Sequence, residues 1–285
     1  MERKTDLGQT FGTKKAKKVI QERVLNAISP TKNGNKDPSQ IDDASQAMLS
    51  SVGNVTSNMA TREELQAVVD DAKPVPIANV DADEIQDVYD PEVLIGSDIL
   101  NQVPIREWQE KVKHKEGIQT HSQFVANRVN AIAGNDTSLQ RLRILRYLSF
   151  VIVFYLISRP GRERGTRRVP PRDKLREQMD PAPEAVVENI RRKFSDAGNM
   201  RKFHIDLLMT HCCAFACIID NFEVQTHDLR NDLRLDQSTI NQYFNEIGAR
   251  VKPVKSKEGS GSTMLARLTL PLNLPKQRVM APKRR

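Results

Sequence analysis

Arginine and lysine side chains are the most numerous groups in this chain that could do chemistry, and the chemistry that they suit is the binding of phosphate. Seven of them lie close together between two apolar stretches, namely Arg159, Arg162, Arg164, Arg167, Arg168, Arg172 and Lys174. Gly and Pro residues are interspersed among them, so we expect a loop from which long cations reach phosphates without strain. The pattern predicts contacts to a nucleic-acid backbone.

Three further basic groups could extend such a surface. They are the helix-terminal trio Arg191, Arg192 and Lys193, the hairpin lysines Lys252, Lys255 and Lys257, and a C-terminal tail with Arg278, Lys283, Arg284 and Arg285. We expect all three groups to contact DNA. For any single member of the trio, compensation of the dipole at a helix C-terminus is the simpler interpretation.

A polar helix face at residues 237–247 offers a different chemistry. It carries Gln237, Ser238, Asn241 and Asn245, whose side chains include amides that can pair with adenine. No Arg or Lys lies on this face, and Asp236 and Glu246 repel phosphate. We therefore expect backbone binding without sequence preference, in which each phosphate contact adds about one unit to the salt dependence.

The chain's cysteines and two of its histidines invite a metal-site interpretation that the spacing does not support. His204, His211, Cys212, Cys213 and Cys217 lie on one predicted helix, where they point in several directions, and no second ligand pair follows at zinc-finger spacing. Buried thiols on a core helix are the better interpretation, and three cysteines within one helix favour a reducing compartment.

Motifs for catalysis are missing from the sequence as well. There is no phosphate-binding Gly-rich loop of the Walker type, no nucleophile elbow and no paired-carboxylate motif. The apolar run Ile144 to Ile157 is too short to span a membrane and is interrupted by Arg146, and the polar, basic N-terminus is not a secretory signal. We expect a protein that is not an enzyme and needs no metal, no cofactor and no membrane.

The elements that should position the candidate residues beyond residue 200 follow one another closely along the chain. An apolar helix is predicted over 203–222, a short helix capped by Thr226 over 226–233, and a third helix that begins after Asp236 and stops at Gly248. The third helix directs Ile240, Phe244 and Ile247 inward. Strands over 249–254 and 263–272, joined by a Gly/Ser-rich tip, follow it, and this order is typical of a winged helix.

The same order of three helices followed by a wing appears once more, nearer the N-terminus. A long buried helix is predicted over 139–157, a short one over 171–179, and a third over 183–194 with Val186, Val187, Ile190 and Phe194 inward. A wing between Ser195 and Lys202 would be very short. The expected fold is mainly α with small β wings, a tandem winged helix preceded by an extended, partly helical linker.

Charge divides the chain into regions. Residues 1–36 carry 9 Lys or Arg against 3 Asp or Glu, residues 37–100 carry 2 against 14, and residues 101–285 carry 33 against 19. We expect a linker over 1–100 (basic 1–36, acidic 37–100), winged helices over 101–200 and 201–275, and a basic tail over 276–285. A basic folded half indicates a polyanionic partner.

The acidic region contains two patterns that resemble capping boxes. These are Thr61 to Glu64 and Asp81 to Glu84, each expected to open a short helix, with the proline-rich residues 73–80 extended between them. The region has little apolar surface, so it should order on a basic partner surface. A disordered acidic spacer that keeps the domain away from other polyanions is the alternative.

Three motifs carry a resemblance to a known family. Leu7 to Ile20, Pro74 to Tyr89 and the terminal region from Ile247 to Pro275 resemble the linker and tandem winged-helix region of the fungal forty-nine-kilodalton-class subunit of RNA polymerase I, the polymerase I-associated factor family. The resemblance covers nearly the whole chain. The family's N-terminal dimerisation domain is absent from this sequence, which leaves recruitment of the heterodimer partner in doubt.

The resemblance implies a function. It implies a non-catalytic subunit of DNA-directed RNA polymerase I that binds duplex DNA and assists initiation and elongation of rRNA synthesis. The implied location is the nucleus, within the nucleolus. It also implies contacts to the core subunits of the polymerase, which we assign to Lys14, Lys15, Lys17, Lys18, Pro76, Ile77, Ile85 and Tyr89.

Two other classes of function stay open on the sequence. One is a winged-helix protein-interaction scaffold in a transcription complex, since winged helices often bind proteins. The other is a sequence-specific transcription factor, which would need a base-reading Arg on the helix at 237–247, where the sequence has none.

Overall fold

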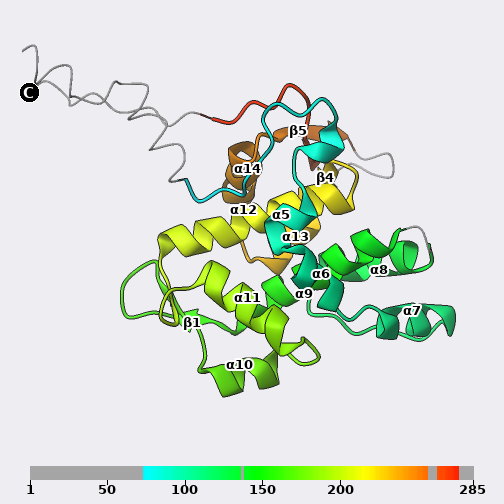
Figure 1. The fold of residues 1–285 in the computed structure, drawn as a ribbon. Coiled ribbons are helices and arrows are strands. Elements are labelled where there is room, and N and C mark those ends of the chain that lie inside the picture. The colour runs from blue at the N-terminus through cyan, green and yellow to red at the C-terminus, as the bar shows by residue number, and fades with distance from the viewer. Residues whose placement is uncertain (1–72, 136–137, 256–261, 276–285) are drawn as a thin grey trace, which may run out of the picture. The chain divides into compact units, whose positions relative to one another are not determined.

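Two long helices, α9 (Leu139–Ile157) and α12 (Lys202–Ile219), pack against each other at the centre of the computed structural model (Figure 1). The structure describes residues 73–135, 138–255 and 262–275, which belong to the compact unit Glu63–Arg285. Each of the two helices buries eleven side chains. A helix that is apolar on most of its surface is stable only inside a core, and this explains why the shorter elements surround this pair.

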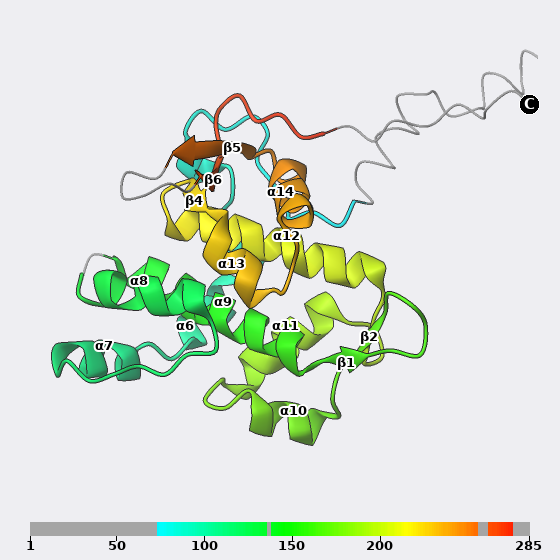
Figure 2. The same cartoon turned by 180° about the vertical axis from the view of Figure 1, so that it is seen from behind.

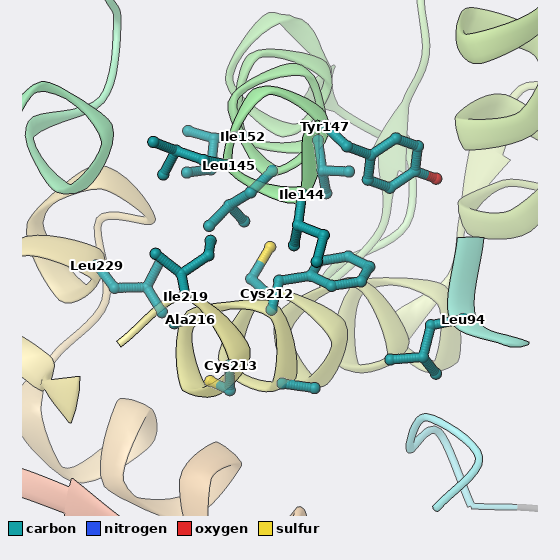
Figure 3. Packing of buried hydrophobic residues seen from close by; sticks show 14 of the residues in the cluster. Leu94, Ile144, Leu145, Tyr147, Ile152, Cys212, Cys213, Ala216, Ile219 and Leu229 are labelled. Carbon is teal, nitrogen blue, oxygen red and sulfur yellow. The ribbon is translucent and has the colours of Figure 1, made fainter. Parts of the chain in front are cut away.

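The three cysteines of α12 are buried thiols, as the sequence predicts. Cys212, Cys213 and Cys217 are each fully buried and free. Cys212 points towards the side of α9 that carries Ile144 and Leu145, whereas Cys213 points to the opposite side of its helix (Figure 3). Burial raises the pKa of all three thiols. Although α12 has the length and hydropathy of a membrane span, most of its side chains pack against this chain.

The elements that follow α12 have the predicted order. They are β4 (Glu223–Gln225), α13 (Thr226–Asp232), α14 (Gln237–Glu246), β5 (Arg250–Lys255) and β6 (Ser262–Arg267). The strands form an antiparallel sheet in the order β4-β6-β5, with Val224 and Val251 both opposite Ala266. Helices followed by a hairpin that pairs back onto a strand before them are consistent with a winged helix.

Two of the three predicted boundary residues in this module are confirmed. Asp236 is the N-cap of α14, and its carboxylate accepts a hydrogen bond from the Thr239 amide at 3.1 Å. Gly248 has a φ of +82°, and a Cβ atom there would lie 2.7 Å from the Leu272 side chain, so glycine is strongly favoured at this stop. The predicted cap at Thr226 is wrong. Gln225 is the N-cap of α13, and Thr226 is buried beneath the sheet as the first residue of the helix.

The upstream elements are also confirmed, with a much reduced sheet. Helices α10 (Arg172–Gln178) and α11 (Glu184–Phe194) follow α9 and a short hairpin, and α11 buries the four predicted residues. Strands β1 (Arg159–Pro160), β2 (Arg167–Arg168) and β3 (Asn199–Met200) form the second antiparallel sheet. The short wing is a tight turn closed by the bridge between Asp196 and Asn199, in which Ala197 and Gly198 have positive φ.

The packed structure begins earlier than the expected boundary near Asn101. From residue 73 the chain runs over α12 and α14, then forms the turn η1 (Ile85–Asp87) and helices α5 (Pro91–Ile95) and α6 (Ser97–Gln102). Tyr89 and Leu94 are almost completely buried. The short helix expected to open at Asp81 is reduced to the single 3-10 turn η1, whose N-cap residue Glu84 makes no side-chain cap hydrogen bond. The motif at Thr61 lies outside the described residues.

Two helices between this segment and α9 were not anticipated. They are α7 (Arg106–Lys113) and α8 (Gln123–Ala133), and α8 packs on α9 and α13. The N-terminus of α8 is capped twice: by Ser122, and by Asp232, which accepts hydrogen bonds from the amides of Gln123 and Phe124 at 2.7 and 2.9 Å. The carboxylate thus satisfies orphan amides of a helix more than 100 residues away.

Candidate nucleic-acid interface

A basic groove lies at the first module, between the β1–β2 hairpin, the start of α10, the last turns of α11 and the start of α12. Figure 2 shows the hairpin beside the N-terminal end of α12 and above α10. The groove has a volume of about 1140 Å³. Its charged lining residues are Arg159, Arg162, Arg168, Arg172, Lys174, Arg191 and Arg201, with Glu163 as the one acid among the lining residues that the structure describes.

Five of these cations have no ion-pair partner among the described residues, namely Arg159, Arg162, Arg168, Lys174 and Arg201. Arg159, Arg162, Arg168 and Lys174 are exposed, and all four were predicted from the sequence to bind DNA. Exposed guanidinium and ammonium groups that converge on a concave surface focus a positive potential there. An anion of the size and charge density of a phosphate is the ligand that such a surface favours.

One carboxylate holds Arg172 and Arg191 of the groove lining, together with the neighbouring Arg192. Glu188 on α11 forms two hydrogen bonds of 2.9 Å with Arg191, an ion pair of 3.1 Å with Arg172 and a longer one of 3.5 Å with Arg192. The bonds from Arg191, together with the neighbouring positive charges, lower the pKa of Glu188. The same contact raises the pKa of Arg191. Glu188 is therefore ionised whenever these arginines surround it.

Arg167 is not part of the groove, although the sequence predicted it to be. Its guanidinium donates hydrogen bonds to Ser158 Oγ at 2.8 Å and to the carbonyl oxygens of Tyr155 and Ser158, and it stacks on the Tyr155 ring at 4.3 Å. Arg168, its neighbour in β2, faces the groove because successive side chains of a strand point to opposite faces. Arg164 is exposed in the hairpin loop outside the groove lining.

Lys193, also predicted to contact DNA, does not line the groove. Its ammonium donates a hydrogen bond to the Leu94 carbonyl oxygen beneath α5, and burial lowers its pKa to about 8. Lys193 instead lines a second, smaller hollow. Arg192, by contrast, is exposed on the outer side of α11, beside a small hollow that Ile99 and Lys193 also line.

The polar face of α14 is occupied by hydrogen bonds within the chain. Gln237 donates to Thr226 Oγ1 at 2.9 Å and to Asn241 Oδ1 at 2.7 Å, while its oxygen accepts from Arg230 at 3.1 Å. Ser238 donates to the Asp236 carboxylate at 2.6 Å. The amide readout that the sequence allowed would have to break these bonds, so this face is a poor reader of bases.

Of the other residues predicted to bind DNA or the polymerase, some are exposed, some are buried, and some lie outside the residues that the structure describes. Lys252 is exposed on β5. The structure does not describe the side chain of Lys255, nor the residues Lys257, Arg284, Arg285, Lys14, Lys15, Lys17 and Lys18. Of the predicted polymerase contacts, Ile77 is 74% exposed and Ile85 is half-buried. Pro76 and Tyr89 are core residues and are not available to a partner.

Two residues of the interface were missed by sequence reasoning. Arg201 lines the groove from the turn before α12, and Glu188 organises the arginines around it. A signal for Glu188 was present, because it precedes Arg191 and Arg192 by three and four residues on one helix face. Within residues 73–135, 138–255 and 262–275, no cluster of His, Cys, Asp or Glu could hold a metal ion.

The described residues form a mainly helical fold with a groove lined by seven cations beside a short β-hairpin. A family model described as A49-like RNA polymerase I associated factor matches residues 1–275. The chain belongs to this family, as the resemblance of the linker and C-terminal motifs indicated.

Two curated relatives are similar to nearly all of the chain. The DNA-directed RNA polymerase I subunit RPA49 of Saccharomyces cerevisiae is 25% identical over 94% of this chain, and the rpa49 subunit of Schizosaccharomyces pombe is 25% identical over 98% of it. The chain spans 67% and 66% of the length of these two relatives, so about a third of each lies outside the match.

Proposed function

We propose that this chain is a non-catalytic subunit of RNA polymerase I that holds nucleic acid by its phosphate backbone and assists initiation and elongation of ribosomal RNA transcription in the nucleolus. Family membership and the names of the two relatives support the polymerase assignment. The observation that carries the nucleic-acid role is the convergence of seven cations on one groove with a single acid among its described lining residues.

The groove favours binding without sequence preference. Its cations lie on the β1–β2 hairpin, at the start of α10, in the last turn of α11 and before α12, and none of them belongs to α14, the helix with the polar face. Cations that contact phosphates position a protein on DNA but carry no sequence information. A subunit that accompanies transcription of any template requires this kind of binding.

The proposal is tested by charge reversal in the groove. Reversing Arg159, Arg162 and Lys174 to Glu should weaken binding of a random-sequence duplex by at least tenfold and reduce the salt slope by about one unit for each lost phosphate contact. These side chains are exposed and have no ion-pair partner among the described residues, so the fold should be unaffected.

A matched control comes from α7 and the turn after it. Reversing Arg106, Lys113 and Lys115 to Glu changes the net charge by the same amount on exposed residues outside the groove lining. Equal loss in the two variants would mean a general charge effect and would remove the groove from the proposal. An unchanged affinity in the groove variant would do the same.

Docking on the polymerase is proposed for the exposed side of the segment that begins at residue 73. Ile77 and Val80 are 74% and 55% exposed, and Asp81, Asp83 and Glu84 follow them directly. Apolar side chains beside a row of carboxylates suit a basic protein surface and would not favour DNA. Co-purification of polymerase I should decrease with Ile77→Asp and should not change with Val254→Asp, an exposed valine on β5.

A further inference from the structure

Glu188 occupies the arginines of the groove in the way that a phosphate would. The two carboxylate oxygens accept parallel hydrogen bonds of 2.9 Å from Nε and a terminal nitrogen of Arg191, and Arg172 approaches one of the same oxygens at 3.1 Å. Paired hydrogen bonds of this kind are the geometry in which guanidinium binds carboxylate and phosphate alike. Arg172 and Arg191 both line the groove.

We propose that Glu188 is a built-in competitor for nucleic-acid phosphate, whose carboxylate holds Arg172 and Arg191 in the free protein and releases them when a phosphate enters the groove. This inference rests on the proposed nucleic-acid binding and adds a residue that controls the affinity of the groove for nucleic acid.

The contacts around Glu188 explain why exchange is feasible. The side chain of Glu188 is 22% exposed, and those of Arg172 and Arg191 are 63% and 21% exposed. Ion pairs this close to solvent contribute little to folding stability, so breaking them costs little. Arg172 and Arg191 can therefore turn from the carboxylate to a phosphate without disturbing α11, whose four apolar side chains stay buried.

The exchange of carboxylate for phosphate also limits the affinity of the groove for DNA and the salt dependence of that affinity. When an arginine leaves Glu188 for a phosphate, one charge pair replaces another, and the carboxylate left unpaired attracts a cation that offsets the counterion released from the DNA. The groove then binds DNA less tightly than its number of arginines suggests, and it releases DNA faster. Fast release is what a sequence-independent grip needs if nucleic acid moves through it.

An opposing role for Glu188 is to fix the arginines in the orientation that DNA requires. The two roles predict opposite changes in DNA affinity when the carboxylate is removed. Glu188→Gln keeps an oxygen that can accept from Arg191 but removes the charge, whereas Glu188→Ala removes both. Competition predicts tighter binding in both variants. Orientation predicts little change for Gln and weaker binding for Ala.

The control is Glu184→Gln, one turn earlier on the same helix. Glu184 pairs with Arg176, which does not line the groove, so the substitution changes the net charge by the same amount and leaves the groove contacts intact. Any general effect of one lost negative charge on DNA attraction appears in this variant.

The experiment measures binding of the full chain to a labelled random-sequence duplex over a series of salt concentrations, with dissociation rates by dilution. We expect Glu188→Gln and Glu188→Ala to bind about three- to tenfold more tightly than Glu184→Gln, with a salt slope steeper by about one unit and slower dissociation. Affinity equal to that of Glu184→Gln, or weaker, would overturn the competitor role. Absence of binding by the unaltered chain would instead overturn the proposed function itself, together with this inference.

Discussion

The hydroxyl of Tyr89 donates a hydrogen bond of 2.8 Å to the carbonyl oxygen of Ile247, at the end of α14. Tyr89 is 1% exposed, and burial raises its pKa, so the hydroxyl is a protonated donor at neutral pH. The bond fastens the acidic N-terminal segment to the second module, 158 residues further along the chain.

Removing this hydroxyl should destabilise the protein without affecting the groove. We expect Tyr89→Phe to lower the free energy of unfolding by about 1 kcal/mol, and Tyr89→Ala to lower it by about 3 to 5 kcal/mol because a large cavity is left. Urea unfolding monitored by circular dichroism measures both. A stability unchanged in the Ala variant would show that residues 73–100 are not part of the folded core.

Asp232 should be a second stabilising residue. Its carboxylate accepts hydrogen bonds from Ser122 Oγ at 2.5 Å and from the amides of Gln123 and Phe124, so Asp232→Ala leaves buried donors without an acceptor. We expect a loss of about 2 kcal/mol or more in the free energy of unfolding. Thermal unfolding should show no comparable change for the exposed Asp83→Ala.

The polar face of α14 should matter for stability rather than for DNA. Because Gln237 is bonded to Thr226, Asn241 and Arg230, its replacement by Ala should lower the free energy of unfolding by about 1 kcal/mol and leave duplex affinity unchanged. Binding assays with several unrelated duplexes test this. A sequence preference in the unaltered chain that disappears in Gln237→Ala would restore the amide readout.

His211 should make the stability sensitive to mildly acidic pH. Its side chain is 3% exposed between the rings of Phe194 and Phe215, and burial lowers its pKa from 6.5 to about 3. Between pH 6.5 and 3 the unfolded chain binds a proton that the folded chain does not, so stability falls as the pH falls, by about 1.4 kcal/mol per unit within this window.

Substitution of the histidine isolates that contribution from the titration of carboxylates. His211→Gln cannot bind the proton, so the difference in unfolding free energy between the variant and the unaltered chain should change in favour of the variant as the pH is lowered from 6.5 to 4. A difference that is constant over this range would mean that His211 does not titrate as its burial implies.

Much of the helical framework could be predicted from the sequence because the signals are local. The span of α9 was predicted to the residue, and the inward face of α11 and the cap at Asp236 were read from spacing and residue type. Helices α5 to α8 were not anticipated. Three of them are eight residues or shorter, and such short helices depend on tertiary packing more than on their own periodicity.

The candidate site was predictable in location but not in detail. The sequence placed a group of cations after α9, and the groove is there, yet it could not separate Arg168, which lines the groove, from Arg167, which bonds to Ser158. Which of two adjacent strand residues faces outward depends on how the strand pairs with β3, and that pairing is not local.

The sequence by itself determined the order of the elements, the buried faces of the long helices, the basic character of the folded half and the family. These properties depend on residue type and on spacing within a few turns of chain. Only the tertiary structure decided that Tyr89 is buried, that Lys193 bonds to the Leu94 carbonyl oxygen, that Gln237 bonds to Asn241, and that Glu188 holds three arginines. Burial and hydrogen bonding at these positions depend on segments that are distant in sequence, and those contacts exist only once the chain has folded.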